Sequence, residues 1–242
     1  MFVKNRLGLI EGTETMLAQE HRMNQITNNL ANVDTAGYKK ENITFWEMMF
    51  TAADNRQRVG KALKPLITHT QGGINTTGNP LDLAINGQGF FQIQTADGVR
   101  YTRNGNFTLN AEGQLSSHDG SLVLGDGGPI VLPNENVQIG QDGQIMADGQ
   151  VVNQLSLVTF EDLNSLEKEG KTFFRIKDNG ALAIPVDVVN IQQGHLEGAN
   201  VSVVSEMTEM IDLQRAYQTQ QKVIQTIDDL DSQSITRVGK LT

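Results

Sequence analysis

Residues 203–230 read VVSEMTEMIDLQRAYQTQQKVIQTIDDL, and the rest of the chain is best interpreted from this run. Its apolar side chains recur every three or four residues, which is the spacing of one face of an α-helix. These positions are Val203, Met207, Met210, Leu213, Tyr217, Ile224, Ile227 and Leu230, with Gln220 at the remaining step. No proline or glycine interrupts residues 199–238, so the spacing predicts one long amphipathic helix over roughly residues 200–235.

A second amphipathic helix is predicted at the other end of the chain, over residues 5–33. A seven-residue repeat there keeps one apolar seam turned towards a partner helix. The repeat consists of Leu9, Met16, Met23 and Leu30, with Ile26 and Val33 in a second row. Gly37 follows, and its left-handed conformation is suited to end the helix. Long helices at both ends favour pairing with each other and with neighbouring copies. The alternative is an ordinary helical hairpin that packs only on its own domain.

The composition excludes several classes of function. The chain has 242 residues, a net charge of −9 and no cysteine. The negative charge disfavours nucleic acid as a partner, because phosphate binding needs a basic face. The lack of cysteine excludes disulfides and thiolate metal sites. We also expect no secretory signal, since Glu11 breaks the first apolar stretch, and no membrane insertion, since no run approaches about 18 apolar residues.

The middle of the chain reads as β structure because of its turn residues. Asp-Gly pairs stand at 97–98, 119–120, 126–127, 142–143 and 148–149, and Asn-Gly pairs at 86–87, 104–105 and 179–180. Both dipeptides favour the positive φ angles of tight hairpin turns. Short runs of strand-forming residues lie between them, at 83–85, 90–93, 107–109, 121–124, 130–132, 137–139, 155–160 and 173–176. Regularly spaced short strands predict an antiparallel sandwich or irregular barrel.

These patterns together predict an α+β fold. It combines a discontinuous helical coiled-coil domain, built from the N- and C-terminal helices, with a central antiparallel all-β domain. The predicted division is a helical segment at 1–40, an extended connector with one strand at 41–80, the β domain at 81–189, a return connector at 190–199 and a helical segment at 200–242.

No arrangement of residues predicts an enzyme or a cofactor site. The four histidines, His21, His69, His118 and His195, are far apart and have no metal-ligand spacing. The aspartates near residues 126 and 142–148 are explained by turn geometry rather than by a calcium loop. No nucleophile elbow or phosphate-binding loop is present. We therefore expect no catalytic residue, no bound metal and no cofactor.

Several segments resemble flagellar rod and hook proteins. They read NNLANVDTAGYK at 28–39, LDLAINGQGFF at 81–91, YTRNGNF at 101–107, GHLEGANV at 194–201 and MIDLQRAY at 210–217. The resemblance covers both ends and the middle in the family's order. It implies a subunit of the basal-body rod, exported by the flagellar type III apparatus and stacked helically around a central channel. In that arrangement residues 1–40 and 200–242 form an inner axial layer, and the β domain lies outside it.

The chain length excludes the hook protein within this family. The segment at 124–133 and the short connector between Trp46 and Pro80 resemble a proximal-rod subunit, and a distal-rod subunit is the alternative. An extracellular β-domain adhesin or carbohydrate-active protein with helical oligomerisation ends is the alternative from a different class. Turnover on glycans would favour it, and copolymerisation with rod proteins would argue against it.

The resemblance implies that the apolar seams form the assembly interface. The expected partners are other copies of the chain, other rod subunits and the export apparatus. The expected interface residues are Leu9, Met16, Met23, Ile26, Asn28, Asn29, Leu30, Asn32, Met207, Met210, Leu213, Tyr217, Ile224 and Ile227. The three asparagines among them are poor residues for a helix interior. We expect them to hydrogen-bond across helices and fix their register, the alternative being a frayed helix end.

Overall fold

The computed structural model describes residues 2–51, 57–133, 137–177, 182–186 and 190–238. The chain divides into two compact units. The helical unit comprises Met1–Ala31, Asn42–Pro65 and Ser202–Thr242, and the β unit comprises Asn32–Glu41 and Leu66–Val201. Both units are therefore assembled from segments that lie far apart in the sequence.

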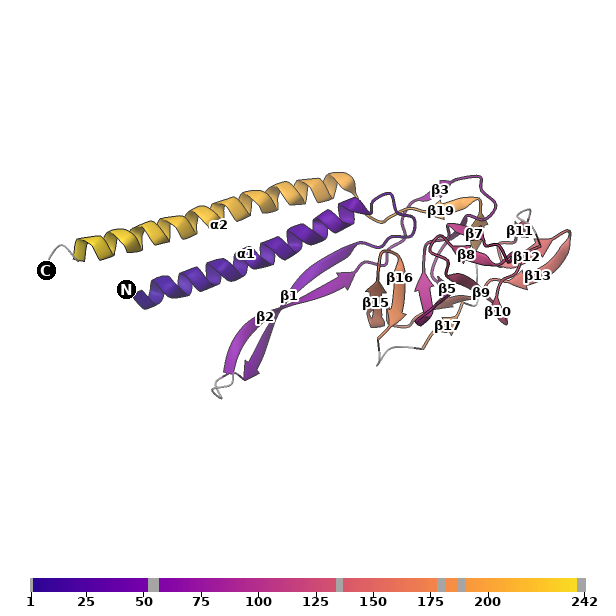
Figure 1. The fold of residues 1–242 in the computed structure, drawn as a ribbon, viewed down its shortest axis with the longest axis horizontal. Coiled ribbons are helices and arrows are strands. Elements are labelled where there is room, and N and C mark those ends of the chain that lie inside the picture. The colour runs from indigo at the N-terminus through magenta and orange to yellow at the C-terminus, as the bar shows by residue number, and fades with distance from the viewer. Residues whose placement is uncertain (1, 52–56, 134–136, 178–181, 187–189, 239–242) are drawn as a thin grey trace. The chain divides into compact units, whose positions relative to one another are not determined.

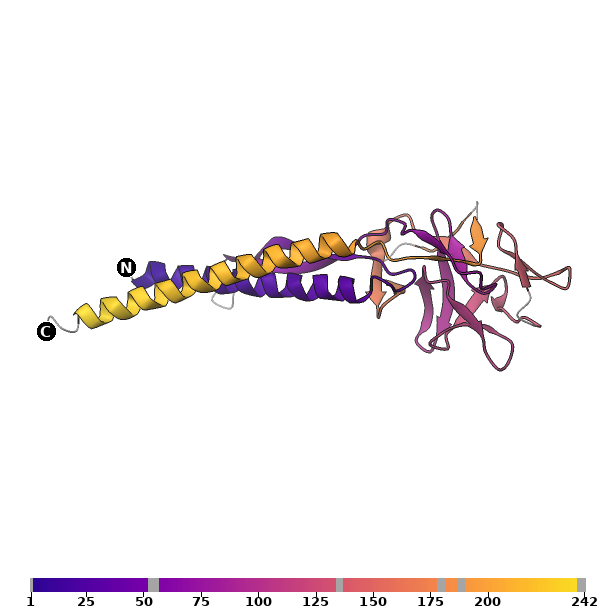
Figure 2. The ribbon, with the colours of Figure 1, turned by 90° about the horizontal axis from the view of Figure 1, so that it is seen from above.

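Two long helices run side by side in the helical unit, as both ribbon views show (Figures 1 and 2). They are α1, Phe2–Ala31, and α2, Val203–Val238. Helix α1 begins at the end of the pair where α2 ends, so the two are antiparallel. Both predicted terminal helices are confirmed. Gly37, predicted to follow the first helix in a left-handed conformation, has φ of 68°.

The stretch at 41–80 differs from its prediction. It contains three strands instead of one, namely β1 at Glu41–Thr51, β2 at Gln57–Ile67 and β3 at Ile74–Thr76. Strands β1 and β2 pair as a two-stranded sheet. The sequence of β1, ENITFWEMMFT, is rich in aromatic and apolar residues that favour strands. The pair of β1 and β2 was not predicted, because no Asp-Gly or Asn-Gly dipeptide between them indicates a turn.

The main sheet of the β unit is antiparallel and has ten strands, seven of which follow the path β15-β16-β6-β5-β9-β8-β7. Strand β10 adds to β9, and β14 pairs with both β5 and β17. The bounds are β5 Phe90–Thr95, β6 Gly98–Thr102, β7 Phe107–Leu109, β8 Leu115–Ser117, β9 Leu122–Gly125, β10 Gly128–Pro129, β14 Leu157–Thr159, β15 Leu166–Glu169, β16 Phe173–Ile176 and β17 Ile184–Pro185. A short 3-10 helix at Leu163–Ser165 leads into β15.

Three smaller sheets complete the β unit. Strands β11, Val137–Ile139, β12, Gln144–Ala147, and β13, Gln150–Gln154, form the first. In the other two, β18, Ile191–Gln193, pairs with β4, Leu83–Ile85, and β19, His195–Glu197, pairs with β3. The predicted return connector at 190–199 thus pairs with segments from the start of the β unit.

The turn residues are the most accurate part of the β prediction. Each of the five Asp-Gly pairs stands at or beside a turn between neighbouring strands, and their glycines all have positive φ. Asp148 also has a positive φ, of 53°, as a two-residue hairpin turn with two left-handed residues requires. The Asn-Gly pair at 179–180 lies outside the described residues. The predicted antiparallel central β region is confirmed.

The predicted strand at 130–132 is wrong. The Ile130 amide donates to the Val123 carbonyl at 3.0 Å, and the Leu132 amide donates to the Gly113 carbonyl at 2.8 Å. Within this run only Val131 forms a β-bridge, with Gln114, so residues 130–132 do not make a strand of their own.

Two buried apolar clusters hold the β unit together. The larger contains Phe91, Ile93 and Phe107, and the smaller contains Phe90 and Phe174. The Phe91 and Phe107 rings meet edge to face with centroids 5.2 Å apart. Strand β5 contributes to both clusters because neighbouring side chains on a strand point to opposite faces.

Candidate functional site

The two helices meet along a seam to which each contributes a buried apolar side chain. Ile26 of α1 is 3% exposed, and Leu213 of α2 is also buried. Gly12 lies opposite α2, where a Cβ would be 2.9 Å from the Gln220 side-chain nitrogen and 3.4 Å from the Ile224 side chain. A larger residue at position 12 would therefore have to displace the Gln220 side chain.

Polar contacts join the same helices at one end of the seam. The Asn29 amide nitrogen donates to a Glu206 carboxylate oxygen at 3.2 Å, and both side chains are 1% exposed. Arg22 forms an ion pair with Glu209 nearby. Directional contacts of this kind are satisfied at one axial offset only, so they fix the register of α1 against α2.

The structure places the predicted interface residues in three environments. Ile26, Asn29 and Leu213 are buried. Leu9, Met16, Met23, Leu30, Asn32, Met210, Tyr217, Ile224 and Ile227 are half-buried. Asn28 and Met207 are exposed. Asn32 lies beyond the end of α1, where its side-chain oxygen accepts from the Thr35 hydroxyl at 3.3 Å.

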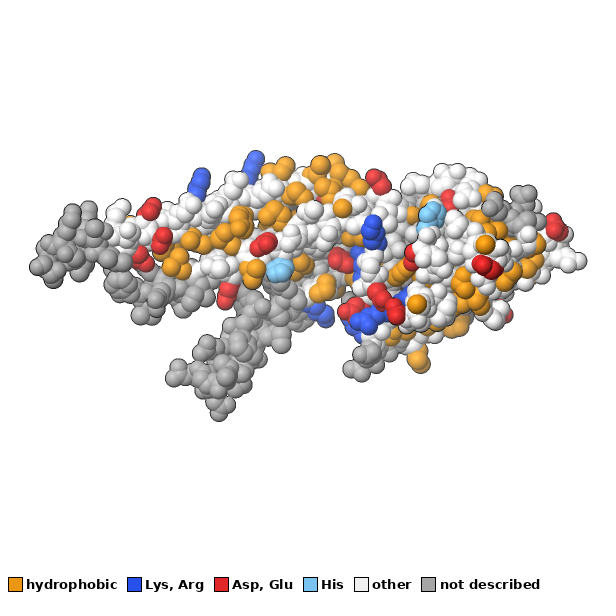
Figure 3. All heavy atoms as spheres, viewed as in Figure 1, with side chains coloured by type: hydrophobic (Ala, Val, Ile, Leu, Met, Phe, Trp, Pro, Cys, Tyr) orange, Lys and Arg blue, Asp and Glu red, His pale blue; other side chains and the backbone are white. Residues whose placement is uncertain are grey.

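Helix α2 carries a second apolar face that α1 does not cover. Val204, Met207 and Ile211 are 76%, 51% and 49% exposed. Ile211 precedes Leu213 by two residues, which places it about 200° around the helix from the seam. Hydrophobic side chains are visible at the surface over the helical pair in Figure 3. The sequence pattern places Met207 in the same stripe as Leu213, and Val204 and Ile211 were not predicted to face a partner.

A groove of about 1000 Å³ also runs beside the seam. Its walls include Ala18, Gln19, Ser205 and Ala216. The Gln19 side-chain oxygen is buried and has no hydrogen-bond partner among the described residues. Buried polar atoms are nearly always hydrogen-bonded, so this atom marks a position that a further group can satisfy.

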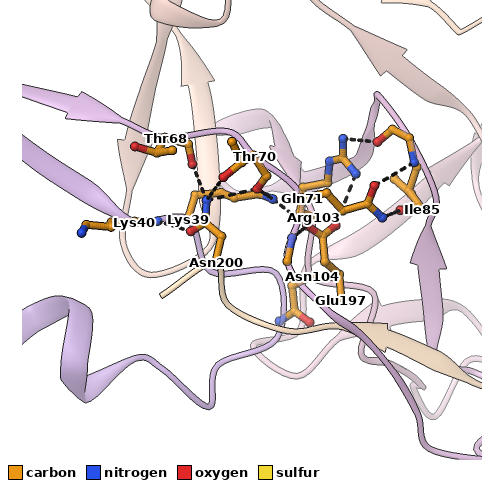
Figure 4. A network of polar contacts seen from close by, with 12 residues as sticks. Lys39, Lys40, Thr68, Thr70, Gln71, Ile85, Arg103, Asn104, Glu197 and Asn200 are labelled. Carbon is orange, nitrogen blue, oxygen red and sulfur yellow. Dashed lines mark hydrogen bonds and ion pairs between the residues drawn. The ribbon is translucent and has the colours of Figure 1, made fainter. Parts of the chain in front are cut away.

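The β unit contains a buried polar cluster, formed by Lys39, Arg103, Glu197 and Asn200, which we call the Glu197 cluster (Figure 4). Glu197 is fully buried. One carboxylate oxygen accepts from the Lys39 ammonium at 2.6 Å and from the Gly72 amide at 3.0 Å. The other accepts from Arg103 at 3.3 Å. Burial lowers the pKa of Lys39, and the Glu197 charge opposes this by favouring the ammonium form.

Arg103 links the cluster to the main sheet. It follows β6, donates to the Gly87 carbonyl at 2.7 Å and lies over the Phe90 ring, 5.3 Å from its centroid. His69 packs against the same Phe90 ring with a centroid distance of 6.0 Å. Burial, reinforced by the charges of Lys39 and Arg103, lowers the pKa of His69 to about 4. The imidazole is therefore neutral at pH 7.

Asn200 satisfies three backbone groups from two other segments. Its oxygen accepts from the Lys40 amide at 2.6 Å, and its nitrogen donates to the Thr68 carbonyl at 2.7 Å and to the Thr70 carbonyl at 3.1 Å. Lys168 of β15 adds a further contact, since its ammonium lies 3.7 Å from the centroid of the Tyr38 ring. Lys168 also pairs with Glu41 at 3.1 Å.

The Glu197 cluster was not predicted from the sequence. Lys39 and Glu197 are separated by 158 residues, so no local pattern joins them. One signal was present, because Lys39, Arg103 and Glu197 each lie in one of the segments that carry the family resemblance. Charged residues in such segments were candidates for a shared site.

The described part of the chain contains no group of three or more His, Cys, Asp or Glu side chains arranged to hold a metal ion. Within the same residues, no helix combines the length and the apolar character needed to span a membrane. The arrangement is suited to holding segments of protein together, through the apolar faces of α2 and the Glu197 cluster.

Comparison with known families gives three matches that cover separate parts of the chain. Residues 12–39 match the family described as flagella basal body rod protein. Residues 84–147 match the D1 domain of the flagellar hook protein FlgE/F/G, and residues 192–237 match the C-terminal region of the flagellar basal body rod proteins FlgEFG. Lys39, Arg103 and Glu197 fall in the first, second and third of these segments.

Similarity to individual proteins extends over nearly the whole length. The flagellar basal-body rod protein FlgF of Caulobacter vibrioides is 34% identical over 96% of this chain and 98% of its own. FlgG of Bacillus subtilis is 33% identical over 92% and 95%. FlgF of Mesorhizobium japonicum is 31% identical over 92% and 94%.

Proposed function

This chain belongs to the flagellar basal-body rod protein family, and from this premise we propose that its terminal helices form the inner axial coiled coil of the rod. The chain is a structural subunit of the rod, and it is not an enzyme. In the proposed arrangement residues 1–40 and 200–242 line the axial layer, and residues 81–189 form an outer β domain. The strand pair of β1 and β2 belongs to the helical unit, so the chain passes between the two units through residues 32–41, 66–72 and 197–201.

The observation that carries this proposal is the second apolar face of α2. A helix that is buried along one face and apolar on the opposite face needs a second partner. Helix α1 covers the side of Leu213 and leaves Val204, Met207 and Ile211 exposed. We infer that a neighbouring rod subunit covers this second face and enters the groove beside Gln19. Such a contact joins unlike surfaces, does not close on itself, and therefore generates a helical filament.

The remaining interface residues divide between two roles. Asn29 sets the register within one subunit through its hydrogen bond to Glu206. Half-buried methionines such as Met16 and Met210 adapt to neighbours that are not equivalent, because methionine is flexible and polarisable.

The proposed partners are other copies of the chain, other rod subunits and the flagellar export apparatus. The net charge of −9 argues against nucleic acid as a partner. The proposed location is the rod that crosses the periplasm, without insertion into lipid. Within the rod we place the chain in the proximal part, because it resembles FlgF. A distal position like that of FlgG is the alternative, since FlgG relatives are almost equally similar.

A charge on the second face of α2 tests the assembly proposal. Ile211→Asp puts a carboxylate where we expect a neighbouring subunit, and burying it there costs several kcal/mol by order of magnitude. We expect normal helix content in the purified chain, but no rods and no motility in cells that carry it. Gln221→Asp is the matched control, since it places the same charge at an exposed polar residue about 80° around the helix from Ile211. Normal motility with Ile211→Asp would show that this face is not an interface.

A further inference from the structure

The chain passes between its two units at four places. These lie between residues 31 and 32, 41 and 42, 65 and 66, and 201 and 202. On the side of the β unit they belong to three segments, which are residues 32–41, 66–72 and 197–201. Every covalent path from the helical unit into the β core therefore runs through one of these segments.

The Glu197 cluster binds all three segments to one another. Within 32–41, the Gly37 amide donates to the Glu197 carbonyl at 2.7 Å, in addition to the Lys39 ion pair. Within 66–72, the Lys39 ammonium donates to the Thr70 carbonyl at 2.8 Å. Residues 197–201 supply Glu197 and Asn200 themselves, whose contacts converge in Figure 4.

Two glycines of these segments stand where backbone from another part of the β unit leaves no room for a Cβ. A Cβ on Gly72 would lie 2.0 Å from the Gly198 carbonyl oxygen. A Cβ on Gly37 would lie 2.3 Å from the Asn104 backbone nitrogen, and Gly37 already has a positive φ. Backbone contact at these points leaves little room for the segments to slide past one another.

We propose that the Glu197 cluster is the mechanical joint of the subunit. It holds the chain in place at all four crossings, on the side of the β unit. Force that enters along any one crossing is therefore shared among all three segments and reaches the β core through them jointly. The inference rests on the proposed function, because only a subunit of a rotating rod carries torque between its layers. Two side chains connect the joint to the main sheet, Arg103 from the end of β6 and Lys168 from β15.

An ionic joint has a property that an apolar one lacks. Apolar contacts are non-directional and can shift by small steps, whereas hydrogen bonds to a charged group fail when their geometry is lost. Glu197 is the shared acceptor for Lys39, Arg103 and Gly72. Removing its charge would leave two buried cations without their partner, which strongly penalises the joined state.

Amide exchange on the purified full-length chain tests the joint. Glu197→Gln should speed exchange in 32–41, 66–72 and 197–201 by about tenfold or more, because hydrogen bonds to a charged group are among the strongest in proteins. Exchange in β5, β6 and β9 should stay unchanged. Glu169→Gln is the matched control, since Glu169 also pairs with an arginine, Arg100, at 2.6 Å, but half-exposed at the surface.

A second variant keeps the test decisive if Glu197→Gln fails to fold. Asn200→Ala removes the contacts to Lys40, Thr68 and Thr70 without leaving a buried charge unpaired. It should loosen the same three segments, and cells carrying it should swim normally in dilute medium but slow down disproportionately in viscous medium. Unchanged exchange in the three segments, or an equal loss of protection throughout the β core, would overturn the joint. Absence of the wild-type chain from isolated rods would instead overturn the proposed function, and the exchange result would stand.

Discussion

At the scale of single residues, the fold of the β unit depends on a few positions where a side chain is excluded or a charge is buried. Gly37 is the clearest of these, because it combines φ of 68° with backbone contact at Asn104. Lys39 and Glu197 are almost completely buried as an ion pair. Such positions tolerate few substitutions, and each gives a defined prediction.

Gly37→Ala should destabilise the β unit by about 2–4 kcal/mol. The substitution forces a Cβ into a left-handed conformation and against backbone, both of which are costly. Gly73→Ala is the control, because a Cβ there meets nothing within 4 Å and its φ is not positive. Chemical denaturation of the two variants measures the difference, and equal midpoints would contradict the proposed close approach at Gly37.

His69 should make the stability of the β unit depend on pH. Its pKa is about 4 in the folded chain, against 6.5 for an unperturbed histidine. Between these values the unfolded chain binds the additional proton, so the free energy of unfolding falls as the pH is lowered from 6.5 to 4. In His69→Phe, which keeps an aromatic ring beside Phe90, this contribution should vanish. Between pH 4 and 6.5, the slope of unfolding free energy against pH should differ between the unmodified chain and His69→Phe by up to about 1.4 kcal/mol per pH unit. Parallel curves of unfolding free energy against pH would show that His69 is not held neutral.

At the scale of elements, the helices and the hairpin turns were predictable because their signals are local. The apolar period of α2 and the Asp-Gly pairs each lie within a few neighbouring residues. The pair of β1 and β2 was not predicted, because residues 52–56 between them carry no characteristic turn dipeptide. The Glu197 cluster was also missed, since it joins residues from three distant segments. The exposed face of α2 was not predicted, because a spacing of three or four residues does not show that the apolar residues of α2 lie on two opposite sides of the helix.

The Asn29–Glu206 contact should govern the register of the helical pair. Asn29→Leu alone should lower the melting temperature of the helical unit, because it leaves the Glu206 carboxylate buried without this donor. Asn29→Leu combined with Glu206→Leu should restore or raise that temperature, since apolar pairs often replace buried polar ones without loss. Motility should still be impaired in the double variant if the polar contact selects the register. Full motility would mean that the apolar seam alone sets it.

At the scale of the whole molecule, the two units should differ in autonomy. The β unit has its own buried clusters, whereas the helical pair leaves apolar surface uncovered. Isolated amphipathic helices are marginal in water because nucleation is costly. We therefore expect fast amide exchange and early proteolysis of residues 1–31 and 202–242 in the free monomer, and protection of the β unit, residues 32–41 and 66–201. Equal protection of both regions would indicate an autonomous helical domain that does not need neighbours.

The most direct measurement is an image of isolated basal bodies at a resolution that separates helices from strands. The account predicts that this chain occupies the rod, with α1 and α2 innermost beside the channel, a neighbouring subunit against Val204 and Ile211, and the β unit outside. Its axial position would also decide between a proximal, FlgF-like place and a distal, FlgG-like one. A rod in which the β unit lines the channel, or in which solvent covers Val204 and Ile211, would contradict the account.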